Sequence, residues 1–166
     1  MSTRELLSGD QMRRALEEMA DGLRRLVADG EAAALVGIRT RGADLARRLH
    51  ALVRERHGWE LPLGILDVTL YRDDLSQLAP NPLVQNSQLD FDVDDRTILL
   101  IDDVLYTGRT VRCALQQLLD YGRPRAVRLA VLVDRGGREI PIQADLVQLH
   151  AEAADDEAVR VQMQEV

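Results

Sequence analysis

The sequence predicts an α/β fold in which a central, mostly parallel sheet carries helices on both faces. Short continuous apolar runs, typical of strands buried on both sides, alternate along the chain with stretches of helical periodicity. Such alternation favours βαβ units and parallel strands. The 166 residues contain no repeat and no convincing linker, so we expect one domain over residues 1–166.

The first half of the chain is predicted to form two helices and two strands. Apolar residues recur at helical spacing over 10–28, where Asp10 is a candidate N-cap, and again from 43 to about 56. The run "AAALVGI" (32–38) is continuous and apolar, as expected for a central strand. The segment "LPLGILDVTL" (61–70) is predicted to be the next strand.

The second half continues the alternation after a polar, proline-interrupted region over 71–96, most of which we expect to be loop. The unbroken apolar run "TILLID" (97–102) predicts a central strand, and "YGRP" ends the helix predicted over 108–121. Three further strands are expected over 126–134, 144–150 and 158–163.

The composition excludes several kinds of chemistry. All 21 basic residues are arginine, which excludes a lysine Schiff base and a Walker A lysine. Cys113 is the single cysteine, so the chain has no internal disulfide and no multi-cysteine zinc site. The net charge of −7 does not favour general nucleic-acid binding. No window is apolar enough for a membrane span and the N-terminus lacks a secretory pattern, so we expect a cytoplasmic protein.

The stretch "IDDVLYTGRT" (101–110) lies where the strand over 97–102 meets the following helix. Ligands of open parallel sheets bind outside the carboxyl ends of the strands, which makes this stretch the first candidate for a site. The turn from Tyr106 to Thr110 can direct backbone N–H groups and two hydroxyls at one anion, at the positive end of the helix dipole. Gly108 would let the backbone approach that anion closely.

Two adjacent acids precede this turn. Ionised Asp102 and Asp103 only accept hydrogen bonds, so they suit vicinal hydroxyls and not phosphate. A molecule that carries ribose hydroxyls beside a monophosphate satisfies both halves of the motif. The alternative is structural: the acids cap the turn, and "TGRT" merely begins a helix.

The stretch 98–112 resembles the phosphoribosyl pyrophosphate signature of type I phosphoribosyltransferases. The rest of the chain is similar to one branch of that family, the pyrimidine operon attenuation regulators that also act as uracil phosphoribosyltransferases. The similarity covers roughly residues 10–147. The matching segments are "LVGIRTRGADLARRL" (35–49), "LDVTLYRDDL" (66–75), "ILLIDDVLYTGRTVR" (98–112), "DYGRP" (120–124) and "LAVLVDRGGREIPIQAD" (129–145).

The resemblance implies a type I phosphoribosyltransferase fold with a small hood and a flexible lid loop at about 71–88, followed by a divergent C-terminal segment at 148–166. It also implies a homodimer or higher homo-oligomer and dependence on Mg²⁺. The metal is expected to arrive with the phosphates of phosphoribosyl pyrophosphate, with Asp102 and Asp103 as candidate protein ligands. The loop 37–42 is expected to hold a strained, even cis, peptide bond.

The resemblance further implies roles for individual residues. The catalytic residues are expected to be Asp102, Asp103, Arg72 and Arg41. The 5-phosphate is assigned to Tyr106, Thr107, Gly108, Arg109 and Thr110. The pyrophosphate is assigned to Thr40, Arg41 and Gly42. Uracil is assigned to Val133, Asp134, Arg135 and Arg138, partly through backbone groups.

These roles predict an enzyme that makes UMP and pyrophosphate from uracil and phosphoribosyl pyrophosphate. Purine enzymes of this type commonly carry an aspartate where Tyr106 stands, which argues against hypoxanthine or guanine as the base. A nucleotide sensor without turnover is a further alternative. It would bind phosphoribosyl pyrophosphate and release no pyrophosphate.

The other alternative is a transcriptional attenuator that binds pyrimidine operon mRNA in response to uridine nucleotides, with or without catalysis. Paired arginines on the predicted helices could form an RNA-facing or subunit-facing patch: Arg13, Arg14, Arg24, Arg25, Arg47 and Arg48. The chain departs from the family, however, at Glu17, Glu18 and Asp21, at Gln143 and in the acidic stretch 151–157. Acids that face phosphates weaken RNA binding, so we rank the enzyme first.

Overall fold

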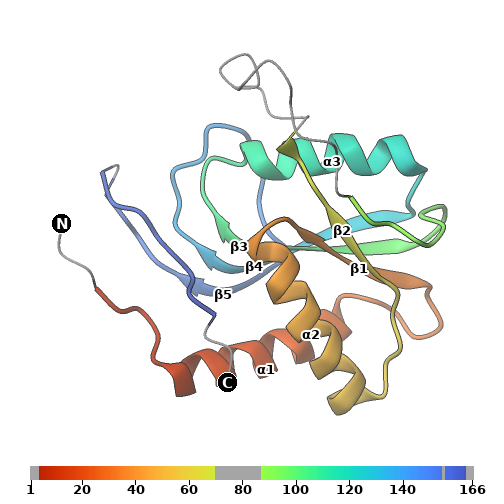
Figure 1. Ribbon diagram of the computed structural model, residues 1–166, viewed down its shortest axis with the longest axis horizontal. Coiled ribbons are helices and arrows are strands. Elements are labelled where there is room, and N and C mark those ends of the chain that lie inside the picture. The colour runs from red at the N-terminus through yellow and green to blue at the C-terminus, as the bar shows by residue number, and fades with distance from the viewer. Residues whose placement is uncertain (1–3, 70–86, 155, 164–166) are drawn as a thin grey trace.

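A computed structural model describes residues 4–69, 87–154 and 156–163. Within these ranges the chain forms three helices and five strands (Figure 1). In chain order they are α1 (Gly9–Arg25), β1 (Ala33–Ile38), α2 (Arg41–His57), β2 (Leu63–Leu66), β3 (Thr97–Leu105), α3 (Arg109–Tyr121), β4 (Ala126–Asp134) and β5 (Leu146–His150).

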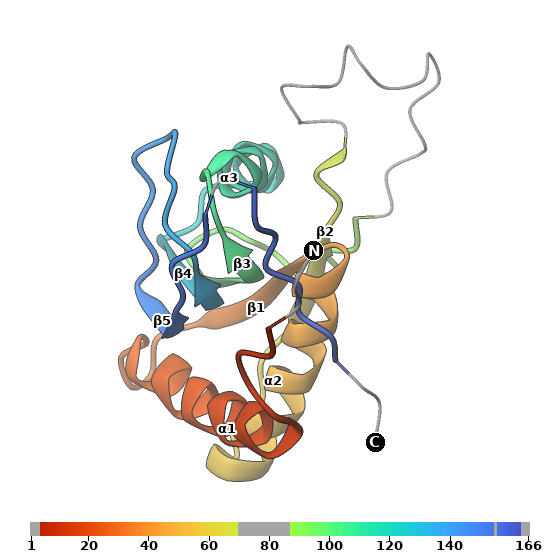
Figure 2. The same ribbon diagram turned by 90° about the vertical axis from the view of Figure 1, so that its left-hand side faces the viewer.

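The five strands form one sheet in the order β2-β1-β3-β4-β5, and every neighbouring pair is parallel. An isolated antiparallel bridge between Ile65 and Gln88 lies beside it. Helices α1 and α2 cover one face and α3 covers the other, as Figures 1 and 2 show. The predicted α/β architecture with helices on both faces is therefore confirmed.

The central strands explain the unbroken apolar runs in the sequence. All six residues of β1 are buried, and alternate residues point to opposite faces of the sheet. Leu35 joins the apolar cluster under α1 and α2, whereas Val36 joins the cluster under α3. In β3, Leu99 and Leu100 divide in the same way. Because both faces are covered, neither strand shows the polar alternation of a half-exposed strand.

Helix α1 begins slightly before its predicted cap. Ser8, and not Asp10, is the N-cap: its hydroxyl accepts from the backbone N–H of Gln11, whose side chain accepts from the backbone N–H of Ser8. This reciprocal pair satisfies two of the free N–H groups at the helix start. The helix also ends earlier than predicted, at Arg25.

The two helices on the shared face are joined by an ion-pair cluster. Asp21 of α1 accepts from Arg56 of α2 at 2.8 Å and contacts His57 at 2.8 Å. The hydrogen bond from Arg56, followed by that from His57, lowers the pKa of Asp21 from 3.8 to about 2, against the opposing effect of burial. Asp21 therefore acts within the fold and does not present a free acid on the surface of α1.

Two of the predicted strands differ from the structure. Strand β2 spans only Leu63–Leu66. Directly after it, the carboxylate of Asp67 accepts hydrogen bonds from both the N–H and the hydroxyl of Thr69, which forms a local turn in place of further strand. Residues 158–163 are not a strand at all. The predicted strand over 144–150 is confirmed as β5. Most of the loop predicted at 71–88 lies outside the described residues.

None of the helices in the described ranges is both long enough and apolar enough to cross a membrane.

Candidate active site

The candidate site lies at the edge of the sheet where the parallel strands end. There β1 leads into the segment 39–42, β3 into 106–110 and β4 into 135–138. Figure 1 shows these strand ends on the left, the side that faces the viewer in Figure 2. Parallel pairing brings together three segments that are far apart in the sequence.

Asp102 and Asp103 are both inside β3, which continues to Leu105 and so runs further than predicted. Each carboxylate accepts from the next backbone N–H: Asp102 from Asp103 and Asp103 from Val104, both at 2.9 Å. Asp102 is buried and Asp103 is half-buried. Burial, reinforced by the adjacent charge of Asp103, raises the pKa of Asp102 well above its usual range.

The segment after β1 packs directly against Asp102. A Cβ atom on Gly42 would lie 2.8 Å from the carbonyl oxygen of Ile101 and 3.1 Å from Oδ1 of Asp102. Only glycine lets the first turn of α2 come so close to β3. The peptide bond between Arg39 and Thr40 is cis, as expected for this loop. Thr40 and Arg41 are exposed beside it.

The turn after β3 has the conformation that the predicted anion site requires. Gly108 is the N-cap of α3 and has φ of 91°, in the left-handed region. A Cβ there would lie 3.2 Å from the carbonyl oxygen of Ile140. The N–H of Arg109 donates to the hydroxyl of Thr107 at 3.2 Å, and Thr110 is exposed. Free N–H groups at this helix start can face an anion.

The side chain of Arg109 contacts a residue that the sequence did not single out. Its Nε donates to Glu139 at 2.7 Å, and the N–H of Glu139 donates to the carbonyl oxygen of Thr107 at 2.9 Å. Both contacts tie the segment after β4 to the turn after β3. The guanidinium of Arg109 thus pairs with Glu139 and its N–H donates to Thr107, and its phosphate role stays a prediction.

Tyr106 joins the segments after β3 and β4. Its ring lies under the guanidinium of Arg135, at 3.8 Å from the ring centroid, and a Cβ on Gly137 would lie 2.5 Å from a ring carbon. Gly137 has φ of 81°. Glycine at this position thus serves both the turn and the contact with the ring.

Arg138 also joins these two segments. Its guanidinium donates to the carbonyl oxygens of Ile142 at 2.7 Å and Tyr106 at 3.0 Å, and to Asp134 at 2.6 Å. The bond from Arg138 is the main reason that the pKa of Asp134 is lowered. Val133 is buried in β4. The uracil roles of these residues stay predictions.

The residues after β5, namely 151–154 and 156–163, are called the C-terminal segment below. The N–H of Ala151 donates to the carbonyl oxygen of Asp134 at 3.0 Å. Further along, Val161 and its neighbours line a cavity of about 310 Å³ together with Arg41 and Asp44. The C-terminal segment therefore reaches both the segment after β4 and the start of α2.

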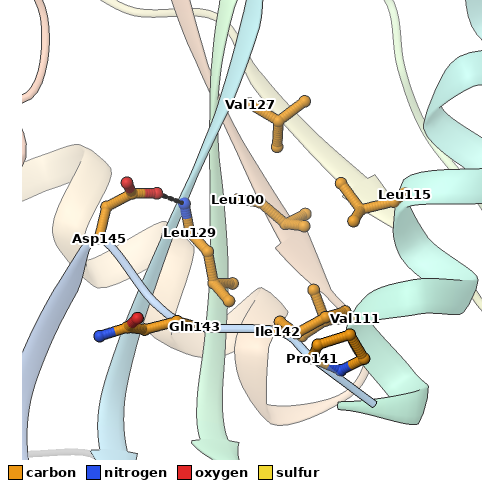
Figure 3. Close-up of a pocket in the computed structure, with 9 residues that line it drawn as sticks. All are labelled: Leu100, Val111, Leu115, Val127, Leu129, Pro141, Ile142, Gln143 and Asp145. Carbon is orange, nitrogen blue, oxygen red and sulfur yellow. Dashed lines mark hydrogen bonds between the residues drawn. The ribbon is translucent and has the colours of Figure 1, made fainter.

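A second cavity, of about 240 Å³, lies between α3 and β4 on the other face of the sheet (Figure 3). Its walls are mostly apolar: Leu100, Val111, Leu115, Val127, Leu129, Pro141, Ile142, Gln143 and Asp145. It contains none of the predicted site residues. Its apolar lining offers few groups that could bind a highly charged ligand.

The two carboxylates of the site suit a Mg²⁺ ion that also binds substrate and water better than they suit a metal ion held by protein groups alone. Within the described ranges, no three His, Cys, Asp or Glu side chains form a group that could hold a metal ion. Magnesium commonly takes one or two carboxylates and completes its shell with water and substrate phosphates. Asp102 and Asp103 fit that pattern.

Arg72 is the one predicted site residue outside the described residues. The other predicted residues meet at one edge of the sheet. Two residues that contact Arg135 were not predicted to belong to the site: Ala154 and Glu157. Ala154 and Glu157 take part through backbone carbonyl groups, which every residue carries, so no sequence signal could have identified them.

Comparisons with known proteins agree with this geometry. Residues 2–165 match the phosphoribosyl transferase domain family. The chain is 50% identical to the bifunctional protein PyrR of Deinococcus radiodurans, over 96% of this chain and 87% of that protein. It is 48% identical to the bifunctional protein PyrR of Thermus thermophilus, over 98% of this chain and 90% of that protein.

Solved structures share the fold at much lower identity. A hypoxanthine-guanine phosphoribosyltransferase from Bacillus anthracis is similar with a TM-score of 0.71 and 15% identity, over 90% of this chain and 85% of that one. A hypoxanthine phosphoribosyltransferase from Staphylococcus aureus gives a TM-score of 0.70 and 20% identity, over 93% of this chain and 80% of that one.

Proposed function

Because the chain belongs to the phosphoribosyl transferase domain family, and within it to the group of bifunctional PyrR proteins, we propose that it is a uracil phosphoribosyltransferase. It would convert uracil and phosphoribosyl pyrophosphate into UMP and pyrophosphate. The observation that carries this proposal is the meeting of paired acids, a glycine turn and an arginine-bearing loop at one edge of the sheet.

In this reaction the bond from the anomeric carbon of ribose to the pyrophosphate oxygen breaks, and a bond from that carbon to N1 of uracil forms. The electron pair of the broken bond leaves with pyrophosphate, and the N1 proton leaves to solvent. Positive charge develops on the ribose in between. Catalysis therefore requires stabilisation of the departing anion and exclusion of water.

Each segment of the site has a proposed part. Asp102 and Asp103 would accept hydrogen bonds from the ribose hydroxyls, and the turn 106–110 would hold the 5-phosphate at the start of α3. Arg41, beside the cis peptide, would pair with the pyrophosphate, for which its planar fork is suited. Arg72 is assigned to the same anion. Bound Mg²⁺ would neutralise part of the pyrophosphate charge.

The base would lie beside the segment after β4. The side chains of Asp134, Arg135 and Arg138 have protein partners, and the N–H of Gly136 donates to Asp134 at 2.9 Å, so the carbonyl oxygen of Gly136 and the backbone of Gly137 would read the ring. This arrangement suits a small pyrimidine whose oxygens and N–H groups lie in one plane. We also propose a cytoplasmic homo-oligomer with one such site in each chain.

Turnover with uracil tests the proposal. Purified protein, labelled uracil, phosphoribosyl pyrophosphate and Mg²⁺ are expected to yield UMP and pyrophosphate. Orotate, hypoxanthine and xanthine, offered under the same conditions, are expected to react at least about 100-fold less well, because an unpaired buried polar group discriminates strongly. Absence of UMP from neutral to alkaline pH would exclude the activity. Binding of phosphoribosyl pyrophosphate without release of pyrophosphate would instead indicate a sensor.

The word "bifunctional" in the names of the relatives favours a second function, for which we propose binding of pyrimidine operon mRNA. The paired arginines give this limited support, because Arg13, Arg24 and Arg47 form ion pairs with Asp10, Asp29 and Asp44. A gel shift with the leader RNA at stated salt, with and without UMP, decides the matter. Equal binding of a scrambled RNA would count against regulation.

A further inference from the structure

Arg135 carries a buried charge whose hydrogen bonds within the described residues end on neutral groups. Only 8% of the residue is exposed. Its Nη1 donates to the carbonyl oxygen of Glu157 at 2.7 Å, and its Nη2 to that of Ala154 at 3.1 Å. The face of the guanidinium lies over the ring of Tyr106. These contacts offset part of the cost of burying the guanidinium, whose Nε has no hydrogen-bond partner among the described residues.

The two carbonyl groups that Arg135 contacts belong to one turn of the C-terminal segment. The N–H of Ala154 donates to the carboxylate of Glu157 at 2.9 Å, and the N–H of Glu157 donates to the carbonyl oxygen of Ala154 at 2.9 Å. These bonds close the turn independently of Arg135. The guanidinium therefore meets two acceptors already held at a fixed spacing, which suits its planar fork.

The C-terminal segment continues from this turn to the other end of the site. Val161 is 6% exposed and packs into the cluster under α1 and α2. Gln162 and Met163 line the cavity that Arg41 also lines. In Figures 1 and 2 the segment, in dark blue, lies beside the carboxyl ends of β3, β4 and β5. It thus borders both the proposed base side and the proposed pyrophosphate side.

We infer that Arg135 is a positioning residue for the base subsite, which fixes the ring of Tyr106 and the turn Ala154–Glu157 relative to each other. The inference rests on the proposed function. It also changes the role predicted for Arg135, which acts through these two neighbours and does not itself touch uracil. If the Tyr106 ring and this turn are ordered before the base arrives, they lose little entropy on binding. Loosening them should therefore weaken binding of the base more than it slows the chemical step.

The first test replaces the donors of Arg135 and keeps its apolar stem. For Arg135→Met we expect the KM for uracil to rise about tenfold through loss of two charge-assisted hydrogen bonds, with the KM for phosphoribosyl pyrophosphate and kcat changing less than about twofold. Lysine cannot reach both carbonyl groups in one plane, so the KM of Arg135→Lys for uracil is expected to lie between that of the wild type and that of Arg135→Met. Arg128→Met, an exposed position on the same strand, is the matched control and should behave as the wild type.

A second pair of variants tests the turn without altering Arg135. Glu157→Ala removes the carboxylate that accepts from Ala154, so it should also raise the KM for uracil, by a smaller factor. Glu157→Gln keeps an acceptor oxygen and should restore wild-type behaviour. These variants decide the matter even if Arg135→Met does not fold.

Hydrogen exchange of peptides from 151–163 separates this inference from the proposed function, because it requires no turnover. Faster exchange in Arg135→Met and Glu157→Ala, together with the selective change in KM for uracil, supports the inference. Unchanged exchange in Arg135→Met overturns it, as does an equal rise of both KM values. If the wild type makes no UMP, the proposed function fails and the exchange result alone decides whether Arg135 fixes the C-terminal segment.

Discussion

Replacing Asp102 and Asp103 together by asparagine is expected to lower kcat/KM for phosphoribosyl pyrophosphate by about 100-fold or more. A hydrogen bond to a charged group contributes about 1.5–3 kcal/mol, and each proposed bond to a ribose hydroxyl would lose its charged acceptor. Asparagine preserves the shape of both side chains, so the packing of Gly42 on β3 should survive. Steady-state kinetics with varied phosphoribosyl pyrophosphate measures the loss. Unchanged kinetics would refute the proposed ribose contacts and favour a purely structural role for the two acids.

The single variant Asp102→Asn is expected to be more stable than the wild type at neutral pH. The pKa of Asp102 is raised in the folded protein, chiefly by burial, so the folded state binds the proton more tightly than the unfolded chain does. The free energy of unfolding therefore falls as the pH rises from the unfolded pKa through the folded one. Asparagine cannot ionise and avoids this loss.

Thermal unfolding between pH 3 and pH 8 measures this difference. We therefore expect Asp102→Asn to raise the Tm at pH 7 relative to the wild type, with no gain near pH 3. Asp90→Asn, an exposed acid shortly before the same strand, is the control and should show no such pH dependence. A gain that is the same at both pH values would mean that ionisation of Asp102 is not its source. A stabilised but inactive variant would show that the acid is kept for function.

The sequence predicted the central strands and the helices because their patterns report burial directly. β1 and β3 are buried on both faces, and short unbroken apolar runs are typical of such strands. The same logic explains the error at 158–163. Val159, Val161 and Met163 face the apolar cluster while Arg160 and Gln162 are exposed, so the segment alternates as a strand does. Alternation reports one buried side and says nothing of a pairing partner.

In the candidate site, the residues that act through their side chains could be predicted from the sequence, whereas contacts to backbone groups could not. The acids and the turn at 102–110 could be predicted because their chemistry depends on residue type. The contacts of Arg135 could not, since they end on carbonyl groups of Ala154 and Glu157. The prediction of Asp10 as the N-cap of α1 was wrong because it rested on residue type alone: Ser8 is an equally good cap, and the position of Gln11 three residues after Ser8 favours the serine.

Gly42→Ala, which adds one methyl group, should lower kcat/KM for phosphoribosyl pyrophosphate about as much as replacement of both acids does. The added Cβ would lie 2.8 Å from the carbonyl oxygen of Ile101, and Ile101 is held in the sheet by its pairing with Gly37. Because the strand cannot move, the segment 39–42 must shift away from Asp102. Displacement by about 1 Å of groups that orient a substrate can cost about 100-fold in rate. We therefore expect kcat/KM for phosphoribosyl pyrophosphate to fall by about that factor.

A matched glycine substitution shows whether the loss comes from this contact. At Gly9, at the start of α1, an added Cβ would have no atom within 4 Å, so Gly9→Ala should keep wild-type kinetics and stability. Overpacking at Gly42 should also lower the free energy of unfolding by about 1–3 kcal/mol, which thermal unfolding would detect. If Gly42→Ala is destabilised yet binds and turns over phosphoribosyl pyrophosphate normally, the contact serves only the fold. A kinetic loss in folded protein would instead show that turnover requires the segment 39–42 to keep its position relative to the acids of β3. The variant moves that segment and leaves the two acids unchanged.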